Sequence, residues 1–313
     1  MGDSVKIYSS QDFPVYLPKL NLLYDDLFSG GKGFRSYLTG LVGKNIALES
    51  KGIELLQQTI EFIHNASLLH DDLVDRSQLR RGKPAAWHKY TPEYAVLAGD
   101  YLLARVMVNL SAYGNIDLVH YTAQMISDLL EGEWLQDSVV GDYFINLEQL
   151  DRIHILKTSS LFKWCLRAPF IAQKQNDKQL HHLLEEMGKI LGQLFQRSDD
   201  LLDFNIRNHE GKAVLGDLKS GYLNSFGAYL TQGMSRAEIQ AFVQSPDLPA
   251  IQRAMGGEEK FQEKLNGFDQ INSAMIQLYH HYLSEVSKLI SQPELIRELA
   301  KLTDVLYWRK KPS

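Results

Sequence analysis

The chain has 313 residues, 44% of them hydrophobic, which is enough for one large core or two ordinary ones. Its formal net charge of −5 argues against a general nucleic-acid-binding protein, because affinity for the phosphate backbone comes mainly from a basic surface. The single cysteine, Cys165, excludes an intramolecular disulfide and fits a reducing compartment. We find no signal-peptide core and no long apolar run, so we expect a cytoplasmic protein without stable membrane insertion.

Apolar residues recur at three- and four-residue spacing through long stretches, as in Ile53, Leu56, Ile60 and Ile63, whereas strand signals are weak. This periodicity predicts an all-α chain folded as a helical bundle. No break is long enough to be a flexible interdomain linker, so we predict a single domain over residues 1–313. In chain order, helices are expected at 16–28, 34–48, 52–76, 93–112, 115–138, 147–173, 177–206, 218–232, 235–245, 258–291 and 294–309.

Two acidic clusters of the form Asp-Asp-x-x-Asp end two of the apolar helical stretches, at 71–75 and 199–203. The outer aspartates of each cluster are four residues apart and therefore share a helix face, where like charges roughly 6 Å apart repel. Local arginines are candidate partners for the other three aspartates: Arg76 for Asp72, Arg197 for Asp200, and Arg207 for Asp203.

Asp71, Asp75 and Asp199 have no Lys or Arg three or four residues away, so their charge must be met from outside the local helix. Carboxylate oxygens are hard ligands that suit Mg²⁺, which is usually held by one or two carboxylates with waters and substrate phosphates. Either cluster alone is more simply read as a solvated acidic helix end. Two identical clusters favour a metal-dependent active site.

Basic residues lie close to the first cluster in the sequence and suggest that the site handles phosphate. Lys32 and Arg35 follow a glycine-rich turn, and Arg80 and Arg81 follow the first cluster. Arginine offers a planar fork for phosphate and lysine a mobile point charge. A solvated loop is the alternative for the arginine pair. His64 lies seven residues before Asp71 on the same helix face, and a lone histidine there is more often a structural hydrogen-bonding group.

These residues resemble the trans-isoprenyl diphosphate synthase (polyprenyl synthetase) family from Gly30 to about Tyr222. The resemblance implies an isoprenoid-synthase-type bundle around a central cavity, usually a homodimer, that joins isopentenyl diphosphate to an allylic diphosphate with three Mg²⁺. It rests on Gly-Lys-x-x-Arg at 31–35, the His and Asp pattern at 64–75, Arg-Arg-Gly-x-Pro at 80–84, Gly-Asp-Tyr-Leu-Leu at 99–103, Gly-Glu-x-x-Gln at 132–136, Lys-Thr-x-x-Leu-Phe at 157–162 and Phe-Gln-x-x-Asp-Asp-x-x-Asp at 195–203.

The resemblance also implies roles for individual residues. The metal ligands would be Asp71, Asp75 and Asp199, with Asp203; isopentenyl diphosphate would be held by Lys32, Arg35, His64 and Arg81; the allylic substrate and its leaving diphosphate would be held by Arg80, Lys157, Thr158, Gln196 and Lys212. Of these, Asp71, Asp75, Asp199, Arg80, Lys157 and Lys212 would be catalytic. The chain departs from the family at Tyr222, where a diphosphate-binding lysine is common, and Lys219 is a candidate substitute three residues earlier.

Product length should depend on the side chains below the first cluster. Ser67 and Ala66, four and five residues before Asp71, are small and lie about 6–7.5 Å down the helix, which predicts an open tunnel and products of roughly twenty carbons or more. Replacing Ala66 by Phe should therefore shorten the product. The rival functions are a class I terpene cyclase, a non-catalytic partner of a prenyl synthase, and a helical interaction scaffold.

Overall fold

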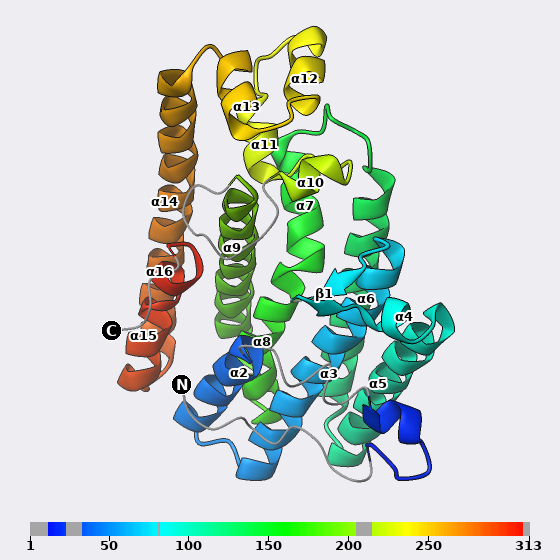
Figure 1. Cartoon of the computed structure of the whole chain (residues 1–313). Coiled ribbons are helices and arrows are strands. Elements are labelled where there is room, and N and C mark those ends of the chain that lie inside the picture. Colours follow the sequence, from blue (N-terminus) through cyan, green and yellow to red (C-terminus); the bar gives the residue numbers. More distant parts are fainter. Residues whose placement is uncertain (1–11, 23–32, 81, 205–214, 309–313) are drawn as a thin grey trace. The chain divides into compact units, whose positions relative to one another are not determined.

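The computed structural model describes residues 12–22, 33–80, 82–204 and 215–308, and the described chain is almost entirely helical (Figure 1). The predicted all-α fold is confirmed. Its only strands among these residues are β1 (Leu79–Arg80) and β2 (Lys83–Pro84), an antiparallel pair that the sequence analysis did not expect. The structure separates into two compact units, 1–126 with 164–181 and 127–163 with 182–313. The single domain predicted over 1–313 stays a prediction.

The first unit holds the first aspartate cluster. Residues 18–22 are helical, and the last part of α8 (Ser159–Ala172) and the start of α9 (Lys178–Asp203) also belong to this unit. Its other elements are α2 (Phe34–Asn45), α3 (Ser50–Val74), the two strands, α4 (Ala86–Lys89), α5 (Pro92–Tyr113) and the beginning of α6 (Ile116–Ser138).

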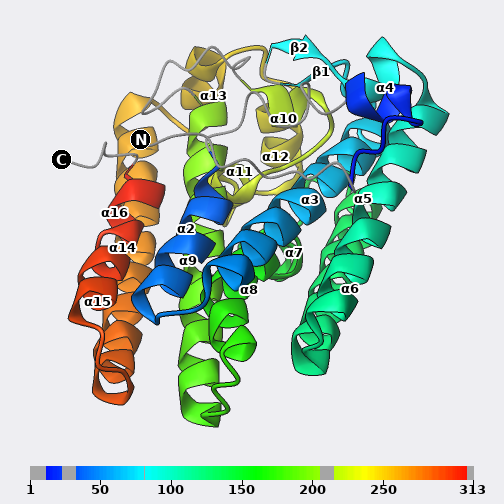
Figure 2. The same cartoon turned by 90° about the horizontal axis from the view of Figure 1, so that it is seen from below.

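Helix α3 is the centre of this unit and packs against both α2 and α5 (Figure 2). The apolar residues whose spacing predicted the helix, Ile53, Leu56, Ile60 and Ile63, are all buried. A close approach between α3 and α5 depends on Gly99, because a Cβ there would lie 2.2 Å from His70 Nε2. The first cluster is thus carried by a helix that is packed on two sides.

Helix α5 begins and ends with clear local signals. The Thr91 side chain accepts from the backbone N–H of Tyr94, Pro92 occupies the first turn, and Gly114 ends the helix with φ 80°. Contrary to our expectation, α5 is long and apolar enough to cross a membrane, with a mean hydropathy of 1.3 over an 18-residue window. Core helices of soluble proteins pass the same test, and about a third of that window is buried.

The second unit holds the second aspartate cluster at the end of α9. It also contains the end of α6 and the start of α8. Its remaining helices are α7 (Leu147–Lys157), α10 (Gly216–Lys219), α11 (Ser225–Leu230), α12 (Arg236–Val243), α13 (Leu248–Ala254), α14 (Glu258–Leu289), α15 (Pro293–Ala300) and α16 (Leu302–Leu306).

The single helix predicted at 147–173 is wrong, because the structure divides it into α7 and α8 at Thr158. Hydroxyl side chains at the break bond outside their own helix: Thr158 donates to Gln196, and Ser159 donates to the carbonyl of Lys189. Helix α9 approaches α8 at two glycines. A Cβ on Gly188 would lie 2.5 Å from the backbone of Lys163, and one on Gly192 would lie 2.3 Å from the backbone of Ser159.

Other expected helices also divide. The range 218–232 becomes α10 and α11, the range 294–309 becomes α15 and α16, and α13 was not expected. The breaks carry turn signals: Gly221 has φ 89°, and the N-cap side chain of Asn224 accepts from Gly227 N–H. Helix α11 packs against α7 and α14.

Candidate active site

The first cluster ends α3 with its three carboxylates in different surroundings. Asp72 is buried and receives hydrogen bonds from Arg80 Nε at 2.9 and 3.1 Å, together with an ion pair from Arg80 Nη2. Asp71 is half-buried and Asp75 is exposed. The predicted local partner, Arg76, does not pair with Asp72, because it ends the helix in the left-handed region with φ 53°. The middle aspartate is therefore committed to the protein, and the outer pair faces more open surroundings.

The β1–β2 hairpin explains why Arg80 reaches Asp72. It pairs residues 79–80 with 83–84 beside the end of α3, and Arg80 sits in β1. Burial opposes the charge on Arg80, but the hydrogen bonds from its guanidinium to Asp72 and the charges of Asp72, Asp71 and Asp75 raise its pKa above the ordinary value. Arg80 thus stays cationic beside the cluster.

Two of the residues predicted to hold isopentenyl diphosphate come together in the first unit. Arg35 Nη1 lies 3.2 Å from His64 Nε2, which joins the start of α2 to the middle of α3. Lys32 and Arg81 lie outside the described residues. Cys165 is buried: its thiol donates to the carbonyl of Arg35, and burial raises its pKa to about 12. It is therefore an inert packing residue rather than a nucleophile.

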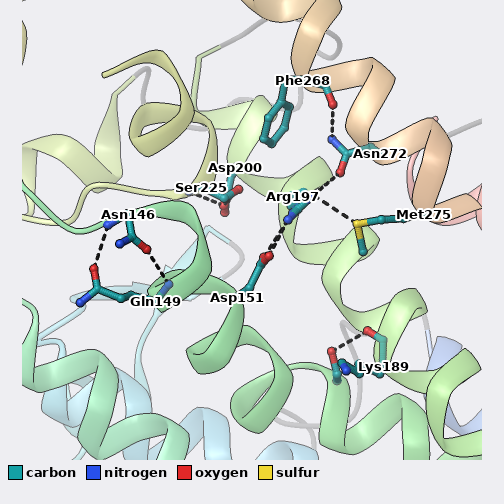
Figure 3. A network of polar contacts seen from close by, with 11 residues as sticks. Asn146, Gln149, Asp151, Lys189, Arg197, Asp200, Ser225, Phe268, Asn272 and Met275 are labelled. Carbon is teal, nitrogen blue, oxygen red and sulfur yellow. Dashed lines mark hydrogen bonds and ion pairs between the residues drawn. The ribbon is translucent and has the colours of Figure 1, made fainter. Parts of the chain in front are cut away.

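The second cluster, at the end of α9, also has a buried and hydrogen-bonded middle aspartate. Asp200 is buried, receives 2.9 and 3.0 Å hydrogen bonds from Ser225 N–H and Gln196 Nε2, and accepts from the Ser225 hydroxyl (Figure 3). Burial raises the pKa of Asp200, and these hydrogen bonds oppose the shift. Asp199 is half-exposed. The expected pairing of Arg197 with Asp200 is wrong, because Arg197 pairs with Asp151 instead.

Asp203 closes the cluster and caps the next helix. Its Oδ1 accepts from the backbone N–H groups of Gly216 at 2.7 Å and Asp217 at 3.2 Å, the first amides of α10. Its Oδ2 is buried and has no hydrogen-bond partner among the described residues. Burial and the charge of Asp217 raise the pKa of Asp203 from 3.8 to about 7. A buried carboxylate oxygen of this kind suits a cation. Its predicted partner Arg207 lies outside the described residues.

The raised pKa of Asp203 predicts a pH-dependent stability. Between about pH 4 and pH 7 the folded chain holds a proton on this group that the unfolded chain has lost, so the free energy of unfolding should fall as pH rises through this window. Asp203→Asn keeps an oxygen acceptor for the two amides and cannot ionise. We expect it to raise the free energy of unfolding by about 2 kcal/mol at pH 8, after allowing for solvent screening, and to change it little at pH 4.

Urea unfolding of both chains with EDTA at pH 4, 6 and 8 measures this difference. Titrating groups that do not interact with Asp203, such as the buried His154, whose pKa desolvation lowers to about 4, are common to the two chains and cancel. Parallel pH profiles for the variant and the wild type would contradict the assignment.

The residues predicted to serve the allylic diphosphate form a connected group in the second unit. Thr158 Oγ1 donates to Gln196 Oε1 at 3.0 Å, and Gln196 in turn donates to Asp200. Lys157 forms an ion pair with Glu133 across the contact of α7 and α6. Gly132 allows that contact, since a Cβ there would lie 2.7 Å from Lys157 N.

The segment after the second cluster contains Lys219 and Tyr222. Lys219 is exposed at the end of α10, and Tyr222 is half-buried with its N–H bonded to the carbonyl of Asp217 at 2.9 Å. Asn224 Nδ2 donates to Asp217 Oδ2 at 2.9 Å. Lys212 lies outside the described residues.

The more exposed carboxylates of the two clusters fit Mg²⁺ by their donor chemistry. Among the described residues, no three His, Cys, Asp or Glu side chains form a ready-made metal cage. Mg²⁺ does not require one, because it is commonly bound by one or two carboxylates and completed by waters and substrate phosphates. Asp71 and Asp75 on α3 and Asp199 on α9 offer oxygen donors of this type.

Two pairings around the second cluster could not be predicted from the sequence. Ser225 lies 25 residues after Asp200, and Asp151 lies 46 residues before Arg197. Neither pairing has a helical spacing, so periodicity gives no signal for it. Glu133 was quoted within a motif without a role.

Comparison with known proteins gives the family. A decaprenyl-diphosphate synthase of Dictyostelium discoideum is 35% identical over 66% of this chain and 45% of its own length, and an octaprenyl diphosphate synthase of Escherichia coli K12 is 33% identical over 61% and 59%. The chain thus spans about half the length of these relatives. The crystal structure of a decaprenyl diphosphate synthase from Rhodobacter capsulatus has a TM-score of 0.83 at 25% identity, covering 95% of this chain and 92% of that one. The Polyprenyl synthetase family model matches residues 18–246, and the chain belongs to this family.

Proposed function

We propose that the chain is a Mg²⁺-dependent prenyltransferase that condenses isopentenyl diphosphate with an allylic diphosphate, head to tail and in trans. The observation that carries this is that the middle aspartates, Asp72 and Asp200, are buried and hydrogen-bonded, while Asp71, Asp75 and Asp199 are more exposed. A scaffold would have no use for this arrangement. Membership of the polyprenyl synthetase family supports the same reaction.

In this proposal the outer aspartates of both clusters would hold Mg²⁺ ions for the allylic diphosphate, and the relatives' names indicate long-chain prenyl diphosphate products. Bound Mg²⁺ would supply charge neutralisation for the departing diphosphate. Arg80 and Lys157 add fixed positive charge, and Thr158 and Gln196 add hydrogen-bonding groups. These groups stabilise charge that develops as the allylic C–O bond breaks, which is electrostatic catalysis.

Arg35 and His64 would orient isopentenyl diphosphate, whose double bond attacks the allylic carbon. The released diphosphate would take the proton, so the proposal requires no dedicated protein base. Lys32, Arg81 and Lys212 keep the roles that the family resemblance gives them, and Lys219 is the proposed substitute for the lysine that Tyr222 replaces.

We also propose a homodimer of cytoplasmic location that makes a product of at least about twenty carbons, an estimate from the helix rise below the first cluster. Exposed apolar side chains on and after α5, Leu97, Val108 and Ile116, support a contact with a second copy. Light scattering after size exclusion measures the mass in solution, and a monomer at all concentrations would remove the dimer.

Incubation with isopentenyl diphosphate, each allylic diphosphate in turn and Mg²⁺, followed by mass analysis, tests the function. A synthase gives longer prenyl diphosphates, and EDTA abolishes them. A terpene cyclase instead releases hydrocarbons from the allylic substrate alone, and a non-catalytic partner gives neither. Either of the last two results would overturn the proposal.

A further inference from the structure

Arg197 is a buried cation two residues before Asp199, and it is bonded on two sides (Figure 3). Its Nη2 donates to both carboxylate oxygens of Asp151 on α7, at 2.9 and 2.7 Å. Its Nη1 donates to Asn272 Oδ1 on α14 at 2.7 Å and lies 3.2 Å from Met275 Sδ. Only 4% of the side chain is exposed. A charge so buried is costly unless it is paired, and Asp151 and Asn272 pair the two Nη groups, while Nε has no hydrogen-bond partner among the described residues.

The same network continues to the C-terminal part of the chain. Asn272 Nδ2 donates to the Tyr307 hydroxyl at 2.9 Å, and that hydroxyl donates to Asp269 at 2.6 Å. On the next residue of α9, the Ser198 hydroxyl donates to the carbonyl of Tyr307 at 2.9 Å. Asn272, Asp269 and Tyr307 all lie beyond residue 246, where the family match ends. The partners on the C-terminal side of the network thus come from residues beyond the family match, whereas Asp151 and Arg197 lie within it.

Arg197 lies on the opposite side of α9 from Asp199, the candidate metal ligand. At 100° per residue, Arg197 points about 200° away from Asp199 around α9. Residues 197, 198 and 200 are buried, and Asp199 is the half-exposed residue among them. Bonds to α7 on one side and α14 on the other therefore fix the rotation of the last turns of α9, and with it the direction of the Asp199 carboxylate.

We propose that Arg197 is a positioning residue for the second aspartate cluster, acting from the Asp151–Asn272–Tyr307 network to orient Asp199 toward its metal. This inference rests on the proposed function, in which Asp199 is a Mg²⁺ ligand. Metal ligands depend on the groups that orient them, and losing such a group typically weakens metal affinity or activity 10- to 100-fold.

The test uses the full chain with Mn²⁺ as a paramagnetic substitute for Mg²⁺ and inorganic pyrophosphate as the anion, and it measures bound Mn²⁺ by EPR. Arg197→Met and Asp151→Asn should each weaken Mn²⁺ binding roughly 10- to 100-fold. Arg197→Lys should fall between these variants and the wild type, because one ammonium cannot reproduce the fork that spans Asp151 and Asn272. Circular dichroism establishes that each variant is folded.

Glu185→Gln is the matched control. It removes the 3.2 Å ion pair between Lys163 and Glu185, which also joins α9 to another helix, but about 18 Å along α9 from Arg197. We expect its Mn²⁺ affinity to stay within twofold of the wild type.

A folded Arg197→Met with wild-type Mn²⁺ affinity would overturn the inference. If that variant does not fold, Asp151→Asn decides, since Asp151 is 22% exposed and its replacement leaves Arg197 bonded to Asn272. Equal losses in Glu185→Gln would show a general effect on α9 and would also overturn it. Unchanged affinity in Asp199→Asn would instead remove the metal role itself, which separates a failure of the proposed function from a failure of the positioning role.

Discussion

Replacing Asp71 or Asp199 by asparagine is expected to lower prenyl transfer roughly a thousandfold, which corresponds to about 4 kcal/mol of lost transition-state stabilisation. Each change removes a carboxylate oxygen that we assign to Mg²⁺ and keeps the size of the side chain. Because both residues are only partly buried, we expect the free energy of unfolding to change by less than about 1 kcal/mol. Steady-state turnover at saturating Mg²⁺ and urea unfolding measure the two effects.

The neighbouring aspartates, Asp72 and Asp200, provide matched controls in which we expect the larger effect on the free energy of unfolding. Asp72→Asn weakens the buried pair with Arg80, and Asp200→Asn turns an amide N–H toward the Ser225 donors. Each should lower the free energy of unfolding by about 1–3 kcal/mol, because a buried polar group loses its partner. Near-normal turnover in Asp71→Asn or Asp199→Asn would contradict the metal assignment.

Replacing Ser67 by phenylalanine is expected to shift the product distribution to shorter chains. Ser67 is half-buried on α3 and its hydroxyl bonds only to the carbonyl of His64, at 2.9 Å, within its own helix, so an aromatic ring can extend from this position. Ala66, by contrast, is fully buried. Ala66→Phe should also shorten the product, but it should cost about 1–3 kcal/mol of stability through overpacking.

Chromatography of the dephosphorylated products measures the shift. Ser67→Ala is the control, because it removes the hydroxyl without adding bulk and should leave the distribution unchanged. The same product lengths from Ser67→Phe and the wild type would show that this side chain does not line the path of the growing chain.

Local patterns predicted most of the helices but few of the contacts at the site. The core face of α3 was read correctly because its burial follows the helical period, and the helix expected at 93–112 matches α5 to within one residue at each end. The break at Thr158 was missed because the signal for it is a hydrogen bond to Gln196, 38 residues away. Helical periodicity contains no information on partners at such separations.

The charge pairing shows the same limit. Counting along the helix proposed Arg76 for Asp72 and Arg197 for Asp200, and both pairings were wrong. Asp72 pairs with Arg80 because a hairpin folds back, and Arg197 pairs with Asp151 because two helices pack together. Both pairings depend on tertiary structure, which overrides sequence proximity.

The network around Arg197 also has a consequence for biosynthesis. Arg197 must find Asn272, 75 residues later, and Ser198 must find Tyr307, 109 residues later. At about 5–20 residues per second, translation supplies that last partner roughly 5–20 s after α9 has been made. During this interval the nascent chain carries an arginine that cannot yet be buried with its full set of partners. The end of α9 should therefore mature only after this later segment has been made, and a ribosome that stalls before Tyr307 would leave it unfinished.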